Sequence, residues 1–579
     1  MRLRLTHTDL AKVSAISLAV VFLIVPRTSD AAAPQSRPAL QGKYMAAKQN
    51  PVISGWATEV IQNTVKNGRV KVWVYFTDKG FADDAGLAAS ATVQSVALST
   101  RQVWRRAKVG RDRVEFGDLP VRQDYVDQII ATGGVLRHTS RWLNAASFEI
   151  DPDLLSGLAA LPSVRKIDPM IGFKYFPEPT VPTPPGMGSL QKPMNTTAPD
   201  ALNYGNSYSQ LQQINVPAVH TLGYKGQGVI VCMMDTGYRK THVAFAPAYA
   251  ESRVLAEHDF IFNDGNTADE PADQPGQMNH GTYTWSALGG QADGSLYGPA
   301  YGAQFLLAKT EDIRSETPIE EDNWVAGMEW AETFGVDVIS SSLGYSDWYT
   351  PASFDGHTAV TSIAASHAAS LGIVVCNSAG NNGYAGLNAP ADADSMITVG
   401  AVDIYGLLAG FSSRGPTADG RTKPEVCACG VSTACANPGG NTTYTYASGT
   451  SLSCPLAGGC AAVILSAHPT WTPMQVREAM MRTGSNTRCP NNNDGWGIID
   501  LLAAVNYPQG TVPGDLNYDS SINLADIMVE INAIYRGAAD PPGPNTLDVN
   551  RDCKVDALDI VLLNDYVYRS GPPPPNPAP

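Results

Sequence analysis

The sequence has a marked hydrophobic run near its N-terminus, and it is short of basic residues. Residues 13–25 form that run, and 13 residues are fewer than the approximately 20 that a bilayer-spanning helix needs. We therefore expect no membrane span once this segment has been removed. The 40 Lys and Arg residues against 55 Asp and Glu give a net charge of −15, which argues against a nucleic acid or an anionic membrane as partner.

Cysteine and histidine are also scarce, with nine of each. Cys232 and Cys376 lie in apolar runs and are expected to be small buried residues. An odd number of cysteines leaves at least one thiol unless chains pair. Four cysteines in polar or Gly/Pro-rich surroundings have no histidine beside them, which argues against a metal site and makes them candidates for disulfides: Cys427, Cys429, Cys435 and Cys489.

The N-terminus itself has the pattern of a secretory signal peptide. Arg2, Arg4 and Lys12 precede the apolar run, and the small residues Ala31–Ala33 follow it. We expect a signal peptide over residues 1–31, cleaved after Ala31; a short anchor is the alternative. The remaining length exceeds what one hydrophobic core organises, so several domains are expected.

Residues 32–175 are expected to form a small α+β domain. Residues 70–76 alternate with period two, as a half-buried strand does, and a second strand is expected within 135–150. Helices are predicted over 126–131 and 153–161, on one face of the sheet. Residues 176–199 are rich in proline and are predicted to be an extended linker.

From residue 200 to 507 apolar strands alternate with helices, which is typical of a parallel α/β sheet. Asp235 and Asn381 each follow such a strand, and ligands in these sheets gather at the carboxyl ends of strands. Strands are predicted over 229–234, 304–309, 336–342 and 373–376, and helices over 283–290, 321–334, 359–371 and 456–468.

Three short stretches within this region carry a nucleophile, a base and a carboxylate. Ser451, in Gly449–Pro455, comes just before a helix, whose unpaired N–H groups can hold an oxyanion. It could instead only cap that helix. His280 precedes a small-residue helix, and Asp235 opens Asp235-Thr236-Gly237. Each is unremarkable alone, but together they supply the three members of a catalytic triad.

These stretches resemble the active-site signatures of the subtilisin-like serine peptidases, the subtilases. Further matches lie at 341–344, 379–381 and 411–416, in the family's order. The resemblance implies a subtilisin-like parallel-sheet peptidase domain over 200–507. It makes Ser451 the nucleophile, His280 the base, Asp235 its orienting partner and Asn381 an oxyanion-hole donor. The walls of the substrate pocket would be Ser342, Leu343 and Gly344 together with Ser378, Ala379 and Gly380.

The chain departs from the family's motifs in a few places. Tyr283 stands where a second histidine is familiar, and Tyr345 where a second glycine is common, which leaves the pocket shape open. Cys454 is interpreted as a buried neighbour of the site. The acidic stretches 310–316 and 320–324 could form a metal site, an acidic substrate rim or an acidic helix N-terminus. By position, residues 32–175 resemble a subtilase propeptide, with self-cleavage expected somewhere in 172–203.

After a hinge at 508–513, an acidic pattern occurs twice, 33 residues apart. Oxygen side chains at loop positions 1, 3, 5, 9 and 12 are what calcium requires, and an amphipathic helix follows each loop. The expected ligands, with the residue that supplies position 7, are Asp515, Asn517, Asp519, Ser521, Asn523 and Asp526 in the first loop and Asp548, Asn550, Asp552, Lys554, Asp556 and Asp559 in the second.

Residues 514–570 resemble a type I dockerin, which implies a small all-α module that binds calcium and docks onto a cohesin-like or cell-surface protein. Ser520 and Cys553 stand at the turn position where the loop favours glycine, so one or both loops could bind weakly. The alternative is an acidic repeat that only packs as two helices. The tail, residues 571–579, is proline-rich.

The sequence thus predicts a secreted or cell-surface serine endopeptidase that is made as a self-cleaved precursor. It would hydrolyse peptide bonds of proteins or peptides through an acyl-enzyme, without a cofactor for the chemistry. Calcium would occupy the dockerin-like loops and could also be structural in the peptidase domain. The alternative is a scaffold-bound adhesion or assembly component whose peptidase domain only matures itself.

Overall fold

The computed structural model describes residues 46–80, 86, 98–170, 202–314, 321–346, 349–508, 514–517, 521–536, 547–550, 554–569 and 571–574. The expected signal peptide and proline-rich linker lie outside these residues. Residues 509–513 of the expected hinge and the last five residues of the tail lie outside them too.

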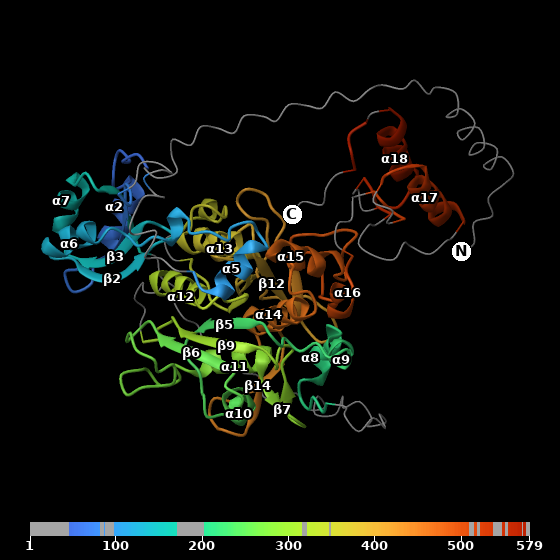
Figure 1. Ribbon diagram of the computed structural model, residues 1–579, viewed down its shortest axis with the longest axis horizontal. Coiled ribbons are helices and arrows are strands. Elements are labelled where there is room, and N and C mark those ends of the chain that lie inside the picture. Colours follow the sequence, from blue (N-terminus) through green and yellow to red (C-terminus); the bar gives the residue numbers. More distant parts are fainter. Residues whose placement is uncertain are drawn as a thin grey trace. The chain divides into compact units, whose positions relative to one another are not determined.

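The N-terminal domain contains a four-stranded antiparallel sheet in the order β2-β3-β1-β4. One face of the sheet packs on helices of its own domain and forms a core with Val72, Val74, Val126 and Leu158. The elements are α2 (Gly55–Asn63), β1 (Val70–Phe76), α5 (Thr100–Ala107), η2 (Phe116–Asp118), α6 (Gln123–Ala131), β2 (Val135–Ser140), β3 (Ala145–Ile150), η3 (Pro152–Leu154), α7 (Leu155–Ala160) and β4 (Val164–Pro169) (Figure 1).

The strand predicted over 70–76 is β1, with the same bounds. The stretch 135–150 was expected to contain one strand and forms two, β2 and β3, joined by a turn in which Asn144 has a φ of 48°. Asparagine tolerates this left-handed conformation, so a hairpin fits there. The helix α5 was not predicted; it buries Gln102, Arg105 and Arg106 and exposes Val103 and Trp104, the reverse of the usual pattern of a helix that packs on a core.

The expected peptidase domain is built on a seven-stranded sheet in the order β13-β12-β11-β10-β5-β9-β6, and its neighbouring strands are parallel. Successive residues of a strand face opposite sides, and the sheet is accordingly buried on both. The strands are β5 (Ile230–Asp235), β6 (Val254–Asp259), β9 (Gln304–Lys309), β10 (Val338–Ser341), β11 (Val374–Ser378), β12 (Ile397–Val402) and β13 (Val426–Cys429).

Two layers of helices cover the two faces of this sheet. Val231 and Met233 contribute to one core with α11 (Asn279–Gly289) and α14 (Thr450–Ala467), while Cys232 and Met234 contribute to the other with α12 (Glu321–Thr333) and α13 (Val360–Ser370). Figure 1 shows α12 and α13 on one side of β5 and α11 on the other. This three-layer arrangement confirms the expected α/β fold.

The other elements of the domain lie around this framework. They are α8 (Tyr208–Gln213), α9 (Val216–Thr221), η5 (Val243–Phe245), α10 (Ala246–Ala250), β7 (Gln291–Ala292), β8 (Leu296–Tyr297), η6 (Pro351–Ser353), η7 (Gly383–Ala385), β14 (Thr433–Ala436), β15 (Tyr444–Ala447), α15 (Pro473–Arg482) and α16 (Leu501–Val505). Among the described residues, only α14 is long and apolar enough to cross a membrane, and it is a mostly buried helix of the core.

The C-terminal module contains two helices, α17 (Leu524–Arg536) and α18 (Ala557–Arg569), which pack on each other. Each follows one copy of the acidic repeat, as the sequence predicted. The small core between them is made by residues from both copies: Leu516, Ile527, Leu547, Val549 and Leu563.

Candidate active site

Asp235 and His280 meet directly at the carboxyl end of β5. The His280 Nδ1 lies 2.6 Å from the Asp235 Oδ1, and the two side chains are buried. Asp235 also accepts hydrogen bonds from the backbone N–H of Thr236 at 2.7 Å and from the hydroxyl of Thr284 at 2.8 Å. These donors fix the orientation of the carboxylate, which can then accept from Nδ1–H of the ring and leave Nε2 directed away.

The position of His280 depends on a glycine beside it. A Cβ on Gly281 would overlap the carbonyl oxygen of Gly237 and come within 3.1 Å of the Asp235 Cβ. Only glycine therefore allows α11 to approach the end of β5 closely enough for the Asp235–His280 contact.

Ser451 lies in the first turn of α14, which begins at Thr450 and not at residue 456 as predicted. Its hydroxyl lies 3.4 Å from the Ser342 carbonyl oxygen, and the Ser342 hydroxyl donates to the Ser451 carbonyl at 2.9 Å. Helix α14 packs against α11 and against the strands β10, β11, β12 and β13 of the sheet. The serine thus stands at a helix N-terminus, where backbone N–H groups are available to a developing oxyanion.

Asn381 is fixed against the same helix start. Its Oδ1 accepts from the backbone N–H and from the hydroxyl of Thr450, both at 2.9 Å. Because the carbonyl half of the side chain is held by Thr450, the amide half is the part that can donate to a substrate. Thr450 also accepts a hydrogen bond at 3.2 Å from the backbone N–H of Gly380.

The two expected pocket walls follow β10 and β11 and are joined to each other. The Asn377 side chain donates to the carbonyls of Leu343 and Ser378, both at 2.9 Å. Gly380 has a φ of +105°, which favours glycine there. The structure thus places 342–344 and 378–380 at neighbouring strand ends, on either side of the Thr450–Ser451 turn.

The unusual residues of the motifs are all buried. Tyr283 packs with Leu452, and the Tyr345 hydroxyl contacts the Glu311 carboxylate. Cys454 lies within the core with its Sγ 3.3 Å from the Ser341 carbonyl oxygen, and burial raises the pKa of its thiol to about 12. It is a buried neighbour of the site, as the sequence predicted.

The start of α12, which belongs to the second acidic stretch, is in contact with the N-terminal domain. Glu321 and Asp322 begin α12, where carboxylates are favoured by the helix dipole. The Trp73 indole donates to Glu321 at 3.0 Å. Asp322 accepts hydrogen bonds from the side chains of Arg137 and Ser147, each at 2.8 Å. These contacts make the start of α12 an acidic helix N-terminus and a surface for the N-terminal domain.

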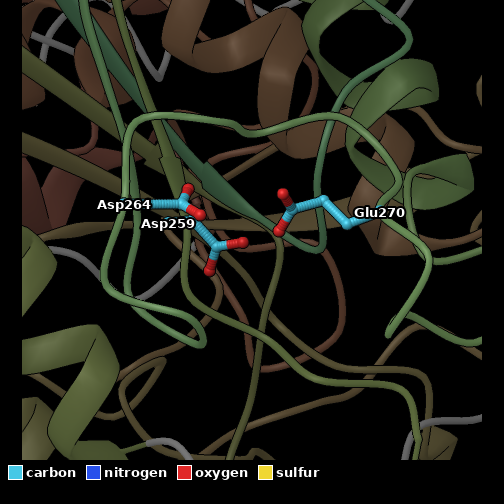
Figure 2. Close-up of side chains that lie close together, drawn as sticks. All are labelled: Asp259, Asp264 and Glu270. Carbon is cyan, nitrogen blue, oxygen red and sulfur yellow. The ribbon is translucent and has the colours of Figure 1, made fainter.

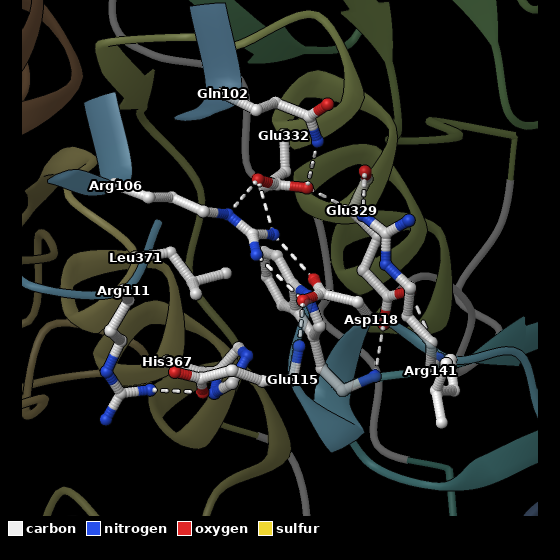
Figure 3. Close-up of polar contacts among 12 residues, drawn as sticks. Gln102, Arg106, Arg111, Glu115, Asp118, Arg141, Glu329, Glu332, His367 and Leu371 are labelled. Carbon is white, nitrogen blue, oxygen red and sulfur yellow. Dashed lines mark hydrogen bonds and ion pairs between the residues drawn. The ribbon is translucent and has the colours of Figure 1, made fainter. Parts of the chain in front are cut away.

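A buried carboxylate further along α12 anchors the arginine-rich helix α5. Glu332 accepts from Arg106 at 2.8 Å, from Arg141 at 2.9 Å and from Gln102 at 2.9 Å (Figure 3). It also contacts Arg105. Arg106 also donates to the Asp118 carboxylate at 2.6 Å. Coulombic attraction to these arginines outweighs desolvation and lowers the pKa of Glu332, so the buried carboxylate is charged.

Three carboxylates of the peptidase domain, Asp259, Asp264 and Glu270, have oxygens within 4.8 Å of one another (Figure 2). Asp259, however, already receives the Lys309 ammonium at 2.8 Å and two backbone N–H groups. The Lys309 ammonium already neutralises the Asp259 carboxylate, so these three residues are not proposed as a metal site.

In the C-terminal module, the carboxylates at loop positions 1 and 12 are buried: Asp515, Asp526, Asp548 and Asp559. Asp526 accepts from the backbone of Leu516 at 2.6 Å, and Asp559 from that of Asn550 at 2.9 Å, so each loop is folded onto its last ligand. Asn517, Ser521 and Asn523, and Asn550, Lys554 and Asp556, lie in the same loops. Asp519 and Asp552, with Ser520 and Cys553, lie outside the described residues.

The disulfide prediction was wrong for three of its four cysteines. Cys427, Cys429 and Cys435 carry buried thiols, and Cys489 is disulfide-bonded. The first two lie on β13 within the central sheet and the third on β14, so their polar sequence neighbours concealed buried strands.

Sequence reasoning also missed residues that position the site. Thr284 stands one helical turn after His280, and Thr450 directly precedes Ser451, so both lay inside recognised stretches. Their hydroxyls could have been noticed as donors near Asp235 and Asn381. The contact of α5 with Glu332 could not have been found in the sequence, because it joins residues more than 200 positions apart.

Comparison with known proteins agrees with this geometry. The model of the subtilase family matches residues 226–497, the model of the Bacteroidota peptidase S8 propeptide domain residues 71–177, and the dockerin type I model residues 513–568. Subtilisin E of Bacillus subtilis is 31% identical over 389 residues, which are 66% of this chain and 85% of that protein. A subtilisin of Bacillus pumilus is 34% identical over 303 residues, 51% of this chain and 97% of its own.

The fold is also that of a solved relative. The crystal structure of fervidolysin from Fervidobacterium pennivorans, described as a keratinolytic enzyme related to subtilisin, matches with a TM-score of 0.56 and 22% identity, covering 82% of this chain and 64% of that one. Fold, motifs and relatives agree. The chain belongs to the subtilase family and is a serine endopeptidase with a propeptide domain and a dockerin type I domain.

Proposed function

We propose that Ser451, His280 and Asp235 form the catalytic triad. Ser451 attacks the peptide carbonyl, His280 takes the hydroxyl proton and later gives it to the leaving amine, and Asp235 stabilises the imidazolium. The observation that supports this most is the buried 2.6 Å contact between Asp235 and His280. His280 lies on α11, which packs against α14, and the first turn of α14 contains Ser451. The acyl-enzyme is then hydrolysed by water along the same proton path.

Asn381 and the Ser451 N–H are proposed to hold the oxyanion, with substrate extended between 342–344 and 378–380. Replacing Asn381 by alanine is expected to lower kcat by about 10²–10³-fold and to leave KM nearly unchanged, because the donor acts mainly on the transition state. Steady-state kinetics on a chromogenic peptide measure this; a change confined to KM would contradict the assignment.

The test of the whole proposal compares the wild type with Ser451→Ala. We expect wild-type protein to cleave a denatured protein substrate and to have a processed N-terminus within 172–203, and the variant to do neither. A processed N-terminus in Ser451→Ala would refute self-cleavage, and absence of turnover by correctly folded, processed wild type would favour the assembly role instead.

Dockerin type I domains and subtilases generally bind calcium, and dockerins bind cohesin partners. We propose that both loops of residues 514–570 bind calcium through the ligands expected from the sequence, which orders the module for a cohesin-like or cell-surface partner. The described donors are oxygens, and four of their carboxylates are buried in one small module, a set that suits a hard divalent cation. Together with the signal-like N-terminus, this supports a protein that is exported and acts outside the cell.

A further inference from the structure

One acidic side chain of the C-terminal module belongs to neither set of expected ligands. Glu530, in the middle of α17, is 0% exposed, and both of its carboxylate oxygens lack a hydrogen-bond partner. An ionised carboxylate in such a place is strongly unfavourable unless a cation or a proton neutralises it. The side chain therefore needs an explanation.

The charges that act on Glu530 belong to the second loop. They are the carboxylates of Asp559 and Asp548. Asp548 and Asp559 stand at positions 1 and 12 of that loop, whereas Glu530 lies on the helix that follows the first loop. The first half of the repeat thus directs a carboxylate toward the ligands of the second half.

The second copy of the repeat shows which kind of side chain is sufficient for packing at the position of Glu530. The residue 33 positions after Glu530 is Leu563, which is fully buried in the core between the helices. Leu563 lies beside Gly514, next to position 1 of the first loop, with its Cδ2 only 3.0 Å from where a Cβ on that glycine would stand. Glu530 and Leu563 thus occupy the same position in the two copies of the repeat, and in the second copy an apolar side chain fills that position.

We propose that Glu530 is an additional calcium ligand of the second loop, which it reaches from the helix of the first. The inference rests on the proposed binding of calcium by these loops. The described donors of the second loop include Asp548, Asn550, Asp556 and Asp559, and calcium accepts six to eight oxygens. Glu530 adds one oxygen donor and one negative charge, and the ion then joins α17 to the loop before α18.

The test uses the full chain with Ser451→Ala, which prevents self-cleavage, and Ca²⁺ as the probe. Asp526→Asn disables the first loop and leaves the second; Asp559→Asn does the reverse. Glu530→Gln, which keeps the shape and removes the charge, is added to each background. Competition with a chromophoric chelator gives the affinities, and any calcium bound by the peptidase domain is common to all the chains.

We expect Glu530→Gln to weaken binding about tenfold or more where only the second loop remains, and to leave binding unchanged where only the first remains. Equal affinity with and without the substitution in the Asp526→Asn background would overturn the proposal, and Glu530 would then be a protonated core residue. If Ser451→Ala itself binds no calcium through residues 514–570, the calcium function fails, and this inference fails with it.

A second variant, with an apolar residue at position 530, keeps the proposal testable if Glu530→Gln does not fold. Glu530→Leu gives the first helix the residue of the second, so we expect the unfolding midpoint of the module in chelator to rise. Its increase on adding calcium should be smaller than that of the parent chain. An increase as large as the parent's would argue against a ligand role.

Discussion

At the scale of single residues, the hydroxyl of Thr284 donates to Oδ2 of Asp235, whereas the Thr236 N–H and His280 contact Oδ1. Thr284→Val keeps the shape and removes the donor. A hydrogen bond to a charged group contributes about 1.5–3 kcal/mol, so we expect kcat to fall by about ten- to hundredfold with KM little changed. Steady-state kinetics measure this.

Thr284→Ser is the matched control, because it keeps the hydroxyl and should retain most of the activity. Wild-type kcat in a folded Thr284→Val chain would show that this bond does not help to orient the carboxylate.

The individual residues differ in how far the sequence could identify them. Asp235, His280, Ser451 and Asn381 each stand in a short motif whose order along the chain can be recognised. Thr284 has no such mark, since a threonine in a helix usually contacts its own backbone and only the fold shows which carboxylate it faces. Cys427 was misjudged because its burial is decided by strands distant in sequence.

At the scale of elements, the contact of α11 with the end of β5 depends on Gly281. Gly281→Ala is expected to destabilise the peptidase domain by at least the 1–3 kcal/mol that is typical of overpacking, because backbone and not a flexible side chain blocks the new methyl group. It should also displace His280, so activity should fall more than stability alone explains. Thermal unfolding and kcat/KM are the measurements.

Gly410→Ala serves as the control for this prediction, since a Cβ there would meet nothing within 4 Å. If both alanine variants unfold at the wild-type temperature, the close approach of the helix to the strand is not needed.

Elements with strong local patterns were predicted well, β1 and β9 with their observed bounds. Element ends that depend on tertiary contacts were not. Helix α14 begins six residues before its predicted start and includes Pro455, because small residues there pack against the sheet and α11. Helix α5 is stabilised by a neighbouring domain, so its sequence alone gave no sign of it.

At the scale of the whole molecule, Glu332 connects the propeptide to the peptidase domain. Breaking a buried ion pair by removing one partner costs about 3–5 kcal/mol, so Glu332→Gln in the mature enzyme should weaken inhibition by added propeptide by about 10²–10³-fold at neutral pH. Inhibition constants measure this. Asp124→Asn in the propeptide, which removes an exposed pair with Arg122, should change little; equal effects of the two variants would contradict a specific role of Glu332.

The same interface should respond to pH through His367, on α13. Its ring packs against Trp142 of the propeptide, and burial, followed by the charge of Arg111, lowers its pKa from 6.5 to about 4. Once the propeptide leaves, the ring is uncovered and its pKa returns toward 6.5. The separated state then binds more protons, so docking is strongest above pH 6.5, weakens as the pH falls, and levels off below about 4.

Between pH 7 and 5.5 this linkage predicts about eightfold weaker binding of the propeptide. Other groups at the interface are Arg106, Asp118, Glu332 and Glu329; burial raises the pKa of Glu329, which favours docking at low pH and opposes the effect. The contribution of His367 is therefore the difference between wild type and His367→Gln, measured by propeptide binding to enzyme blocked at Ser451. Identical pH profiles of the two proteins would show that the ring does not govern release, whereas a flatter profile in the variant would assign the acid-induced weakening to His367.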